Sequence, residues 1–204
     1  MPDKKLLIIE KAVELIAKNG FETTSVQEIT EACGISKGAF YIYFKSKESL
    51  LISIFELFSE RLSERISTVF EMDIPAKEKL QMFLCIQLEE IDKYSDFILM
   101  QLRENTKPDN RELFSVMTQM DMKLNEHLQT LLVGSYGDKV SLHLKDLILL
   151  VKGITKSYVE LIVLCKTNFD YRDLAKFLVD RVDSLVAGLT TPFLTEDTKK
   201  LLDR

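Results

Sequence analysis

Residues 23–50 read TTSVQEITEACGISKGAFYIYFKSKESL and contain three helix starts that organise the first part of the chain. Ser25 stands three residues before Glu28, so each side chain can satisfy a free backbone amide of the other at the start of a helix. That helix is short, because Gly34 suits the left-handed conformation that closes a helix. The stretch therefore begins with a short, capped helix.

The same stretch carries two further helix starts. Ser36 can cap a third helix that runs to about Tyr43, and Ser46 can cap a fourth. Ahead of them, apolar residues recur at helical spacing over residues 6–16, and Gly20 supplies a stop. Two short helices joined by a tight glycine turn, with a long helix after them, form a helix-turn-helix pattern.

The rest of the chain is predicted to be all-α. Glycine and proline are few and fall between periodic apolar runs, and Asp73-Ile74-Pro75 interrupts the fourth helix. We expect a three-helix helix-turn-helix domain at residues 1–50 and a larger helical domain at residues 51–204. The periodicity predicts that helices after the interruption cover about residues 76–93, 96–105, 110–133, 141–166, 171–189 and 196–203.

Composition narrows the class of protein. The 204 residues are 46% hydrophobic with a formal net charge of −5, which argues against coating nucleic acid through bulk positive charge. The longest run without a charged residue, Ser184–Thr195, has 12 residues, whereas a bilayer span needs about 20. The first residues lack the apolar run of a signal peptide, so we expect a cytoplasmic protein. We expect Cys33, Cys85 and Cys165 to be reduced structural thiols.

The third helix has a surface suited to double-stranded DNA. Its first turn, Ser36–Ala39, is slender enough to approach base edges in the major groove, where Lys37 can reach a guanine or a phosphate. Tyr41 and Tyr43 carry phenolic donors and Lys47 carries a charge, all suited to phosphate oxygens. For an isolated run of this kind, the alternative is that the aromatic residues pack and the lysines are solvated. The capped short helices on either side favour DNA binding.

Three segments, Thr23–Ile29, Gly34–Gly38 and Tyr41–Leu50, resemble the DNA-binding domain of the tetracycline-repressor (TetR) family. The resemblance covers under a quarter of the chain and implies a transcriptional regulator that binds DNA. Phe40 and Phe44 are expected to face the core. The resemblance implies base reading by Gln27, Lys37, Gly38, Ala39 and Ile42, and phosphate contacts by Thr24, Ser25, Tyr41, Tyr43 and Lys47.

The last two long helices are the candidates for a dimer interface. Gly153 and Ser157 are small residues one turn apart, which lets a second helix approach closely, and Phe177 and Leu185 belong to the apolar stripe of the final long helix. The resemblance implies a four-helix bundle with two helices from each subunit. Two subunits related by a two-fold axis would read an inverted repeat. The alternative for each of these residues is a place in the core of a single chain.

The resemblance also implies an effector site in the carboxyl-terminal half, where a small molecule alters the spacing of the two DNA-binding domains. A set rich in Met and Phe can adapt to an apolar guest, and three cationic side chains could meet its head group. Each apolar member could instead be plain core, and Lys156 could pair with Glu160 on the surface. The candidates are Phe83, Phe97, Met100, Arg103, Phe114, Met117, Met120, Lys152 and Lys156.

Catalysis and metal binding have little support. The two histidines, His127 and His143, are 16 positions apart, and no phosphate-binding loop or nucleophile motif accompanies them. We expect no enzyme activity, cofactor or metal. Together with the resemblance, the sequence predicts a ligand-responsive repressor whose homodimer binds an inverted-repeat operator on double-stranded DNA. A small, largely apolar effector is expected to release it from the operator. No membrane is expected among its partners. The alternative is an all-helical carrier or sensor of a small molecule that does not bind DNA.

Overall fold

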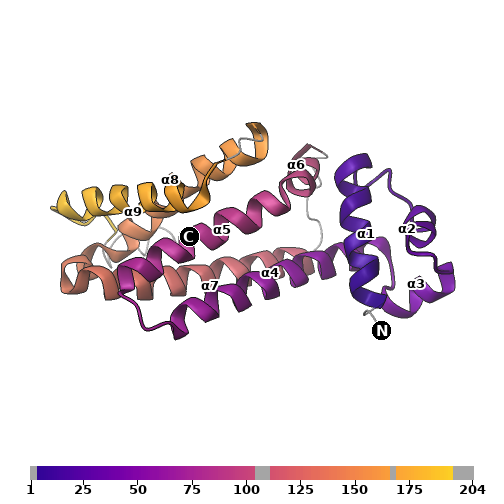
Figure 1. The fold of residues 1–204 in the computed structure, drawn as a ribbon, viewed down its shortest axis with the longest axis horizontal. Helices are drawn as coiled ribbons and strands as arrows, with labels where there is room; N and C mark the ends of the chain where they lie inside the picture. The colour runs from indigo at the N-terminus through magenta and orange to yellow at the C-terminus, as the bar shows by residue number, and fades with distance from the viewer. Residues whose placement is uncertain (1–3, 104–110, 166–168, 195–204) are drawn as a thin grey trace. The chain divides into compact units, whose positions relative to one another are not determined.

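The computed structural model describes residues 4–103, 111–165 and 169–194, which form nine α-helices and one 3-10 helix (Figure 1). The all-α prediction is confirmed. The elements in chain order are α1 (Lys4–Asn19), α2 (Val26–Cys33), α3 (Lys37–Tyr43), α4 (Lys47–Glu71), α5 (Ala76–Lys93), α6 (Ser95–Arg103), α7 (Arg111–Tyr136), η1 (Gly137–His143), α8 (Leu144–Cys165) and α9 (Tyr171–Ala187).

The chain forms two compact units. The first comprises Met1–Ser63 and Asp92–Met120, and the second comprises Glu64–Ile91 and Asp121–Arg204. Helices α4, α5 and α7 therefore contribute residues to both units. The division into functional domains at residue 50 stays a prediction.

In the first unit, α2 and α3 begin where the caps predict. The Ser25 hydroxyl accepts from the Glu28 amide at 3.2 Å, and the Glu28 carboxylate accepts from the Ser25 amide at 2.7 Å. Gly34, at φ 64°, closes α2. The Ser36 hydroxyl accepts from the Ala39 amide at 3.2 Å and starts α3. Because each cap satisfies backbone groups at a helix end, both short helices have defined limits.

The core of the first unit holds the helix-turn-helix in place. Helix α1 packs against α2 and α6, and α2 packs against α3 (Figure 1). Phe40 and Phe44 are buried, as predicted, with their ring centroids 5.5 Å apart. The aliphatic side chains that share this core include Ile8, Ile16, Ile29 and Leu50. The side chains of α3 that face away from this core are therefore presented on a rigid support.

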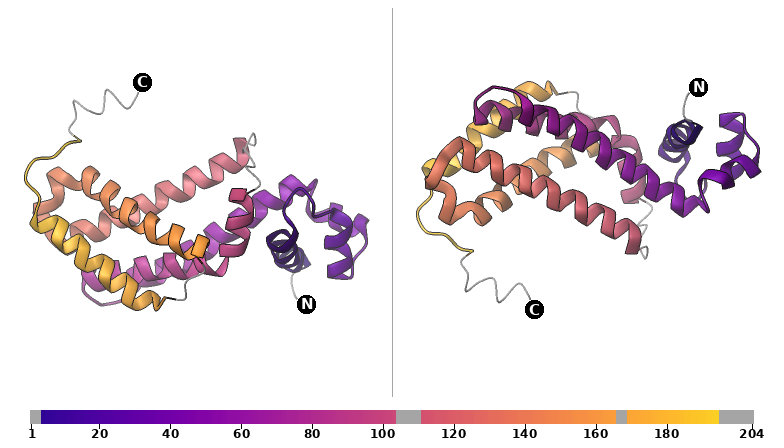
Figure 2. Two further views of the ribbon diagram at one scale, coloured as in Figure 1. Left: turned by 90° about the horizontal axis from the view of Figure 1, so that it is seen from above. Right: turned by 90° about the horizontal axis from the view of Figure 1, so that it is seen from below.

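In the second unit, α8 packs against α9 (Figure 2), and ionic contacts join α9 to two earlier helices. The Asp183 carboxylate of α9 accepts from the Lys77 ammonium of α5 at 2.5 Å and from the Tyr136 hydroxyl of α7 at 2.9 Å. Burial and the neighbouring Asp183 carboxylate both raise the pKa of Tyr136. The phenol therefore remains a hydrogen-bond donor at neutral pH.

The structure differs from the prediction between α7 and α8. We expect a break over residues 134–137, but α7 continues through Gly134 to Tyr136. A Cβ at Gly134 would lie 3.1 Å from the Cβ of Ala76, so this glycine permits close packing rather than a turn. The turn falls at Gly137, which has φ 63° and begins η1. The helix predicted over residues 196–203 lies outside the described residues.

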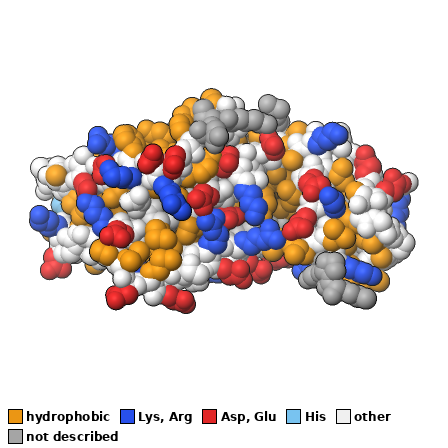
Figure 3. Space-filling model, viewed as in Figure 1, with side chains coloured by type: hydrophobic (Ala, Val, Ile, Leu, Met, Phe, Trp, Pro, Cys, Tyr) orange, Lys and Arg blue, Asp and Glu red, His pale blue; other side chains and the backbone are white. Residues whose placement is uncertain are grey.

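Charges of both signs are mixed on the surface. On the face shown in Figure 3, Lys and Arg side chains alternate with Asp and Glu side chains. Such a face has no large field of one sign. Among the helices that the structure describes, none combines the length and the apolar character needed to cross a membrane.

Candidate DNA interface and effector cavities

Helix α3 exposes several large side chains. Lys37 and Gly38 are exposed in its first turn, and Tyr41, Ile42 and Tyr43 are exposed in its second. Ile42 is 78% exposed although it is aliphatic. An apolar side chain held so openly between tyrosines, on a capped helix, is suited to contact a partner surface. Apart from Ala39, which is half-buried, the sequence-predicted residues of α3 are therefore accessible, although Tyr43 lies on a different side of the helix from Lys37 and Tyr41.

The predicted residues around α2 are already engaged within the chain. The Ser25 hydroxyl donates to the Glu28 carboxylate at 2.8 Å, and the Gln27 amide donates to the Glu31 carboxylate at 2.9 Å. Hydrogen bonding to Ser25 lowers the pKa of Glu28, so this carboxylate stays ionised at neutral pH. Both Ser25 and Gln27 are exposed, and their contacts with DNA stay predictions.

Thr24 is placed differently from the prediction. Its side chain is fully buried, and its hydroxyl donates to the Gly20 carbonyl at 2.6 Å. The hydroxyl is thus engaged within the chain, and the expected contact of Thr24 with phosphate stays a prediction. Thr24 holds the turn that precedes α2.

Lys47 has a structural contact that the sequence did not reveal. Its ammonium donates to the carbonyls of Phe21 and Glu22 at 2.6 and 3.2 Å, and it lies 4.5 Å from the centroid of the Phe21 ring. These groups are separated from Lys47 by 26 and 25 positions in the chain, so local patterns carry no signal for the contact. Lys47 therefore ties the start of α4 to the turn after α1.

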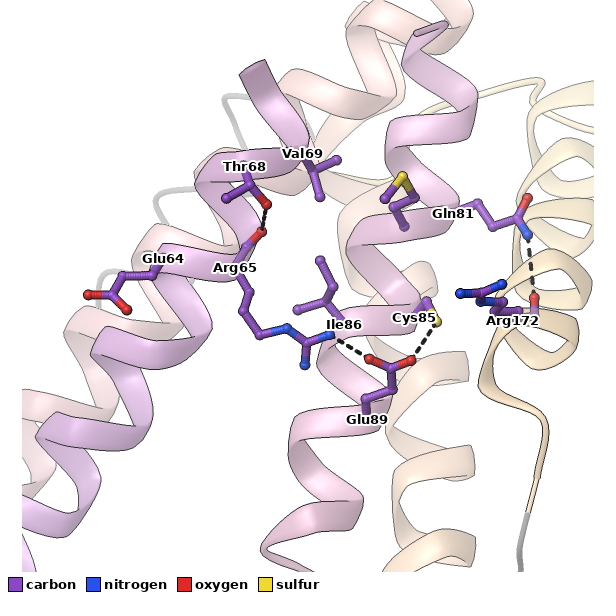
Figure 4. A pocket seen from close by; sticks show the side chains of 10 residues that line it. Glu64, Arg65, Thr68, Val69, Gln81, Cys85, Ile86, Glu89 and Arg172 are labelled. Atoms are coloured by element: carbon purple, nitrogen blue, oxygen red, sulfur yellow. Dashed lines mark hydrogen bonds and ion pairs between the residues drawn. The ribbon is translucent and has the colours of Figure 1, made fainter. Parts of the chain in front are cut away.

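A cavity of about 630 Å³ lies between α4, α5 and α9 in the second unit. Arg65 spans it and pairs with Glu89 at 2.5 Å, and the Cys85 thiol donates to the same carboxylate at 3.5 Å (Figure 4). Arg65 also pairs with the buried Glu90 at 2.6 Å. Arg172 of α9 lines the opposite wall (Figure 4). The cationic groups on α4 are thus already neutralised by carboxylates on α5.

The electrostatics of this cavity keep Cys85 protonated. Burial, together with the neighbouring Glu89 carboxylate, raises the pKa of the Cys85 thiol to about 11. Burial also raises the pKa of Cys33. Thiolates are the reactive form of cysteine, so both groups are structural thiols at neutral pH, as their apolar flanks predict.

The second cavity, of about 200 Å³, lies between α5, α7 and α8. Its walls are mainly apolar and include Phe83, Leu128 and Val151. The Lys152 ammonium at its edge donates to both carboxylate oxygens of Asp121 at 2.7 and 3.0 Å. An apolar enclosure with a few polar groups is the usual form of a small-molecule site.

Three of the predicted effector residues, Phe83, Lys152 and Lys156, line this second cavity. Lys156 also lies 3.8 Å from Glu160, the surface pair that the sequence left as the alternative. The polar residues Asn125 and Thr155 line the same cavity and were not among the sequence candidates. In the sequence, each is a polar residue within an otherwise apolar helical stripe. This pattern is too common in helices to single out either residue.

The other predicted effector residues lie elsewhere. Phe97 is buried in the core of the first unit, with its ring 5.8 Å from that of Phe55. Phe114 and Met117 are exposed. None of these three side chains lines either of the two cavities described above, and their part in an effector site stays a prediction. Met100 and Met120 are half-buried and line neither cavity, and the side chain of Arg103 lies outside the described residues.

Comparison with known proteins gives the family. The sequence model described as "Bacterial regulatory proteins, tetR family" matches residues 8–54. The HTH-type transcriptional regulator YerO of Bacillus subtilis, whose function is uncharacterized, is 35% identical over 204 residues, which cover 98% of this chain and 70% of that protein. The chain belongs to the tetR family. It is therefore a transcriptional regulator with a helix-turn-helix domain.

Two solved structures of transcriptional regulators share the fold over more than nine-tenths of the chain. FadR of Bacillus halodurans, a fatty acid degradation regulator, has a TM-score of 0.75 and 22% identity, and the match covers 94% of this chain and 98% of that one. FadR of Bacillus subtilis, solved in complex with stearoyl-CoA, has a TM-score of 0.70 and 24% identity, with 91% and 99% covered. At these identities the likeness shows the fold alone.

The tetR-family chain also exposes an apolar row on α8. Leu149, Leu161 and Leu164 are exposed, and Gly153 and Ser157 are exposed between them at the spacing of one helix face. A Cβ built on Gly153 meets no atom within 4 Å. This face is therefore open to the close approach of another helix.

The two predicted interface residues of α9 differ in how exposed they are. Phe177 is exposed, with its ring 5.9 Å from that of Tyr158 on α8 and under the guanidinium of Arg181 at 5.1 Å. Leu185 is half-buried. The role of all four predicted residues in a dimer stays a prediction.

Proposed function

We propose that this regulator represses transcription by binding an inverted-repeat operator as a homodimer, and that a small, largely apolar effector releases it. The observation that carries the proposal is the exposed face of α3 on its capped and buried support. A side chain as exposed and apolar as Ile42 has a ready partner in the methyl group of thymine. The helix is also slender at its start, where Gly38 adds no side chain.

In the proposed complex, contacts divide into base reading and positioning. Lys37, Gly38, Ala39 and Ile42 of α3 face base edges, together with Gln27 of α2. Phosphate oxygens accept hydrogen bonds from Ser25, Tyr41, Tyr43 and Lys47, which set the register without reading sequence. Ser36 caps α3, and the partial positive charge of a helix start favours an anion such as phosphate.

A homodimer is supported by the exposed row on α8, since soluble monomers seldom expose continuous apolar faces. We expect the wild-type chain to sediment as a dimer and the variant Leu161→Arg/Leu164→Arg to sediment as a monomer, because each arginine would be desolvated in the interface. Leu142→Arg is the matched control, as Leu142 is exposed on η1. If the double variant sediments like the wild type, the interface does not involve this row.

The smaller cavity between α5, α7 and α8 is the proposed effector site. Its apolar walls and its two lysines suit a ligand with an apolar body and an anionic group. The stearoyl-CoA held by FadR of Bacillus subtilis supports an acyl compound as this ligand. Release requires that the effector bind more tightly to the form with low affinity for DNA, since equal affinity for both forms shifts nothing.

The test is a selection of random duplex DNA against the purified protein at about 0.1 M salt, where non-specific attraction is moderated. We expect the wild type to enrich an inverted repeat. The variant Tyr41→Phe/Tyr43→Phe, which removes two exposed hydroxyl groups, should bind that repeat more weakly. Tyr158→Phe removes a hydroxyl in the second unit and is the control. Failure of the folded wild type to enrich any sequence would favour the carrier or sensor function.

A further inference from the structure

An ion pair between α7 and α8 stands at the mouth of the smaller cavity. The Lys152 ammonium donates to both carboxylate oxygens of Asp121, at 2.7 and 3.0 Å. Both residues line the cavity, yet the side chain of Lys152 is 37% exposed and that of Asp121 is 53% exposed. Side chains that border a cavity and also meet solvent lie where the cavity opens. A ligand that enters through this opening therefore meets the ion pair.

The Asp121 carboxylate fills the anion position beside Lys152. Besides the two contacts with the ammonium, its Oδ2 atom accepts from the Asn125 amide at 3.1 Å, one turn further along α7. A carboxylate can only accept hydrogen bonds, and an ammonium can only donate them. A ligand group that binds Lys152 in place of Asp121 must therefore also be an acceptor, and a carboxylate copies the group that it replaces.

This ion pair can be exchanged at small cost. An ion pair between exposed side chains stabilises a protein little, because both charges are well hydrated when they are apart. Its contribution corresponds to a factor of at most roughly fivefold in an equilibrium constant. A second carboxylate can thus replace Asp121 on Lys152 if the rest of the ligand gains from burial.

The cavity behind the pair offers that burial. Its apolar lining includes Phe83, Leu128 and Val151, which come from three different helices. Its volume is about 200 Å³, which holds about seven chain groups if each takes the roughly 30 Å³ of a water molecule in the liquid. An acyl chain of about this length, with its carboxylate at the mouth, matches both parts of the site.

We propose that the carboxylate of a free fatty acid exchanges with Asp121 on Lys152, so that Asp121 is a built-in competitor of the ligand. The inference rests on the proposed function, because this cavity is the proposed effector site. It deepens that function by naming the ligand class and the residue that limits its affinity. The exchange removes an ionic contact between α7 and α8, and α7 contributes residues to both compact units.

The test measures binding of octanoate and of 1-octanol to the full chain by isothermal titration calorimetry. The two ligands share their chain, and only octanoate carries a carboxylate. Asp121→Asn keeps the size of the side chain and removes the competing charge, so it should bind octanoate roughly threefold to fivefold more tightly than the wild type. Lys152→Met should bind octanoate more weakly by a similar factor. Neither substitution should change the affinity for 1-octanol.

Two control variants separate the exchange from a general effect of charge. Asp138→Asn makes the same change in net charge at an exposed residue of η1 that lines neither cavity, and it should leave octanoate binding unchanged. Lys156→Met removes the other lysine of the cavity, which lies 3.8 Å from Glu160. It should weaken octanoate less than Lys152→Met does. A loss confined to Lys156→Met would place the carboxylate elsewhere and overturn the inference.

The remaining outcomes distinguish this inference from the function on which it rests. Unchanged octanoate binding by Asp121→Asn overturns the exchange and leaves the cavity as an effector site if 1-octanol binds. An equal gain for both ligands means that Asp121 obstructs the opening by its bulk, which also overturns the exchange. If Asp121→Asn favours octanoyl-CoA and not octanoate, the anion is a phosphate and the fatty acid is overturned. If none of the three ligands binds, the inference and the effector site fail together, while DNA selection tests the repressor independently.

Discussion

Lys47→Ala separates a structural role from a role in DNA binding. In the structure, the Lys47 ammonium donates to two carbonyls of the turn after α1 and lies over the ring of Phe21. The sequence predicts that the same group contacts phosphate. A lysine ammonium has three donor hydrogens, so the two carbonyls leave one for DNA, and the substitution is expected to affect both properties.

The magnitude follows from the two kinds of contact. A hydrogen bond from a charged group contributes about 1.5–3 kcal/mol, and an exposed cation–π contact about 0.5–1 kcal/mol. Lys47 is only half-buried, and solvent screening reduces these values, so we expect a loss of about 1–2 kcal/mol in the free energy of unfolding. For a chain of this length each kcal/mol lowers Tm by about 2–4 °C.

The assays are thermal unfolding by circular dichroism and the salt dependence of operator binding. We expect Tm to fall by about 2–8 °C, and the slope of log K against log salt to become shallower by about 0.9 if one phosphate contact is lost. Lys45→Ala, at an exposed neighbouring lysine, is the control for stability and should leave Tm unchanged. An unchanged Tm for Lys47→Ala would refute the structural role, and an unchanged slope would refute the phosphate contact.

Three further substitutions or modifications test other parts of the structure. Gly34→Ala should lower the free energy of unfolding by about 1–2 kcal/mol. The cause is backbone strain alone, because φ is 64° and nothing lies within 4 Å of the added Cβ. A Tm equal to that of the wild type would contradict this reason. At pH 8, iodoacetamide should label the exposed Cys165 well before Cys85, as measured by peptide mass spectrometry. The reason is that a pKa raised to about 11 keeps the Cys85 thiol protonated until the pH approaches that value. Equal labelling of the two cysteines would show that Cys85 is an accessible thiolate. Arg65→Met should lower the free energy of unfolding, measured in urea, by roughly 2 kcal/mol, because it leaves the buried Glu90 without its ion pair. Adding Glu90→Gln should restore part of the loss. No recovery would mean that the arginine stabilises the fold through its packing.

The helix-turn-helix could be predicted in detail because its limits depend on local chemistry. The capping box of Ser25 and Glu28, the glycine at 34 and the cap at Ser36 each act within a few residues, and all appear in the structure. The burial of Phe40, expected together with the family resemblance, is also confirmed. The same reasoning misplaced the turn near Gly134, since a glycine needed for close packing resembles one needed for a turn.

The site residues were predicted less completely, because burial and partners depend on distant parts of the chain. Thr24 has the residue type and position of a phosphate contact, yet the fold buries it against Gly20. Phe83 and Phe97 have the same side chain in apolar helices, but one lines a cavity and the other lies in the core of the first unit. Residue type alone does not distinguish such pairs.

The helical class and the caps and order of the helix-turn-helix could be predicted without coordinates, because they depend on interactions between neighbours in the chain. Only the tertiary structure decided that Lys47 holds the turn at Phe21 and that Asp121 and Lys152 form an ion pair where both line one cavity. Those facts require helices that are far apart in the sequence to pack together. That packing determines which polar groups are buried and whether each one has a hydrogen-bond partner among the described residues.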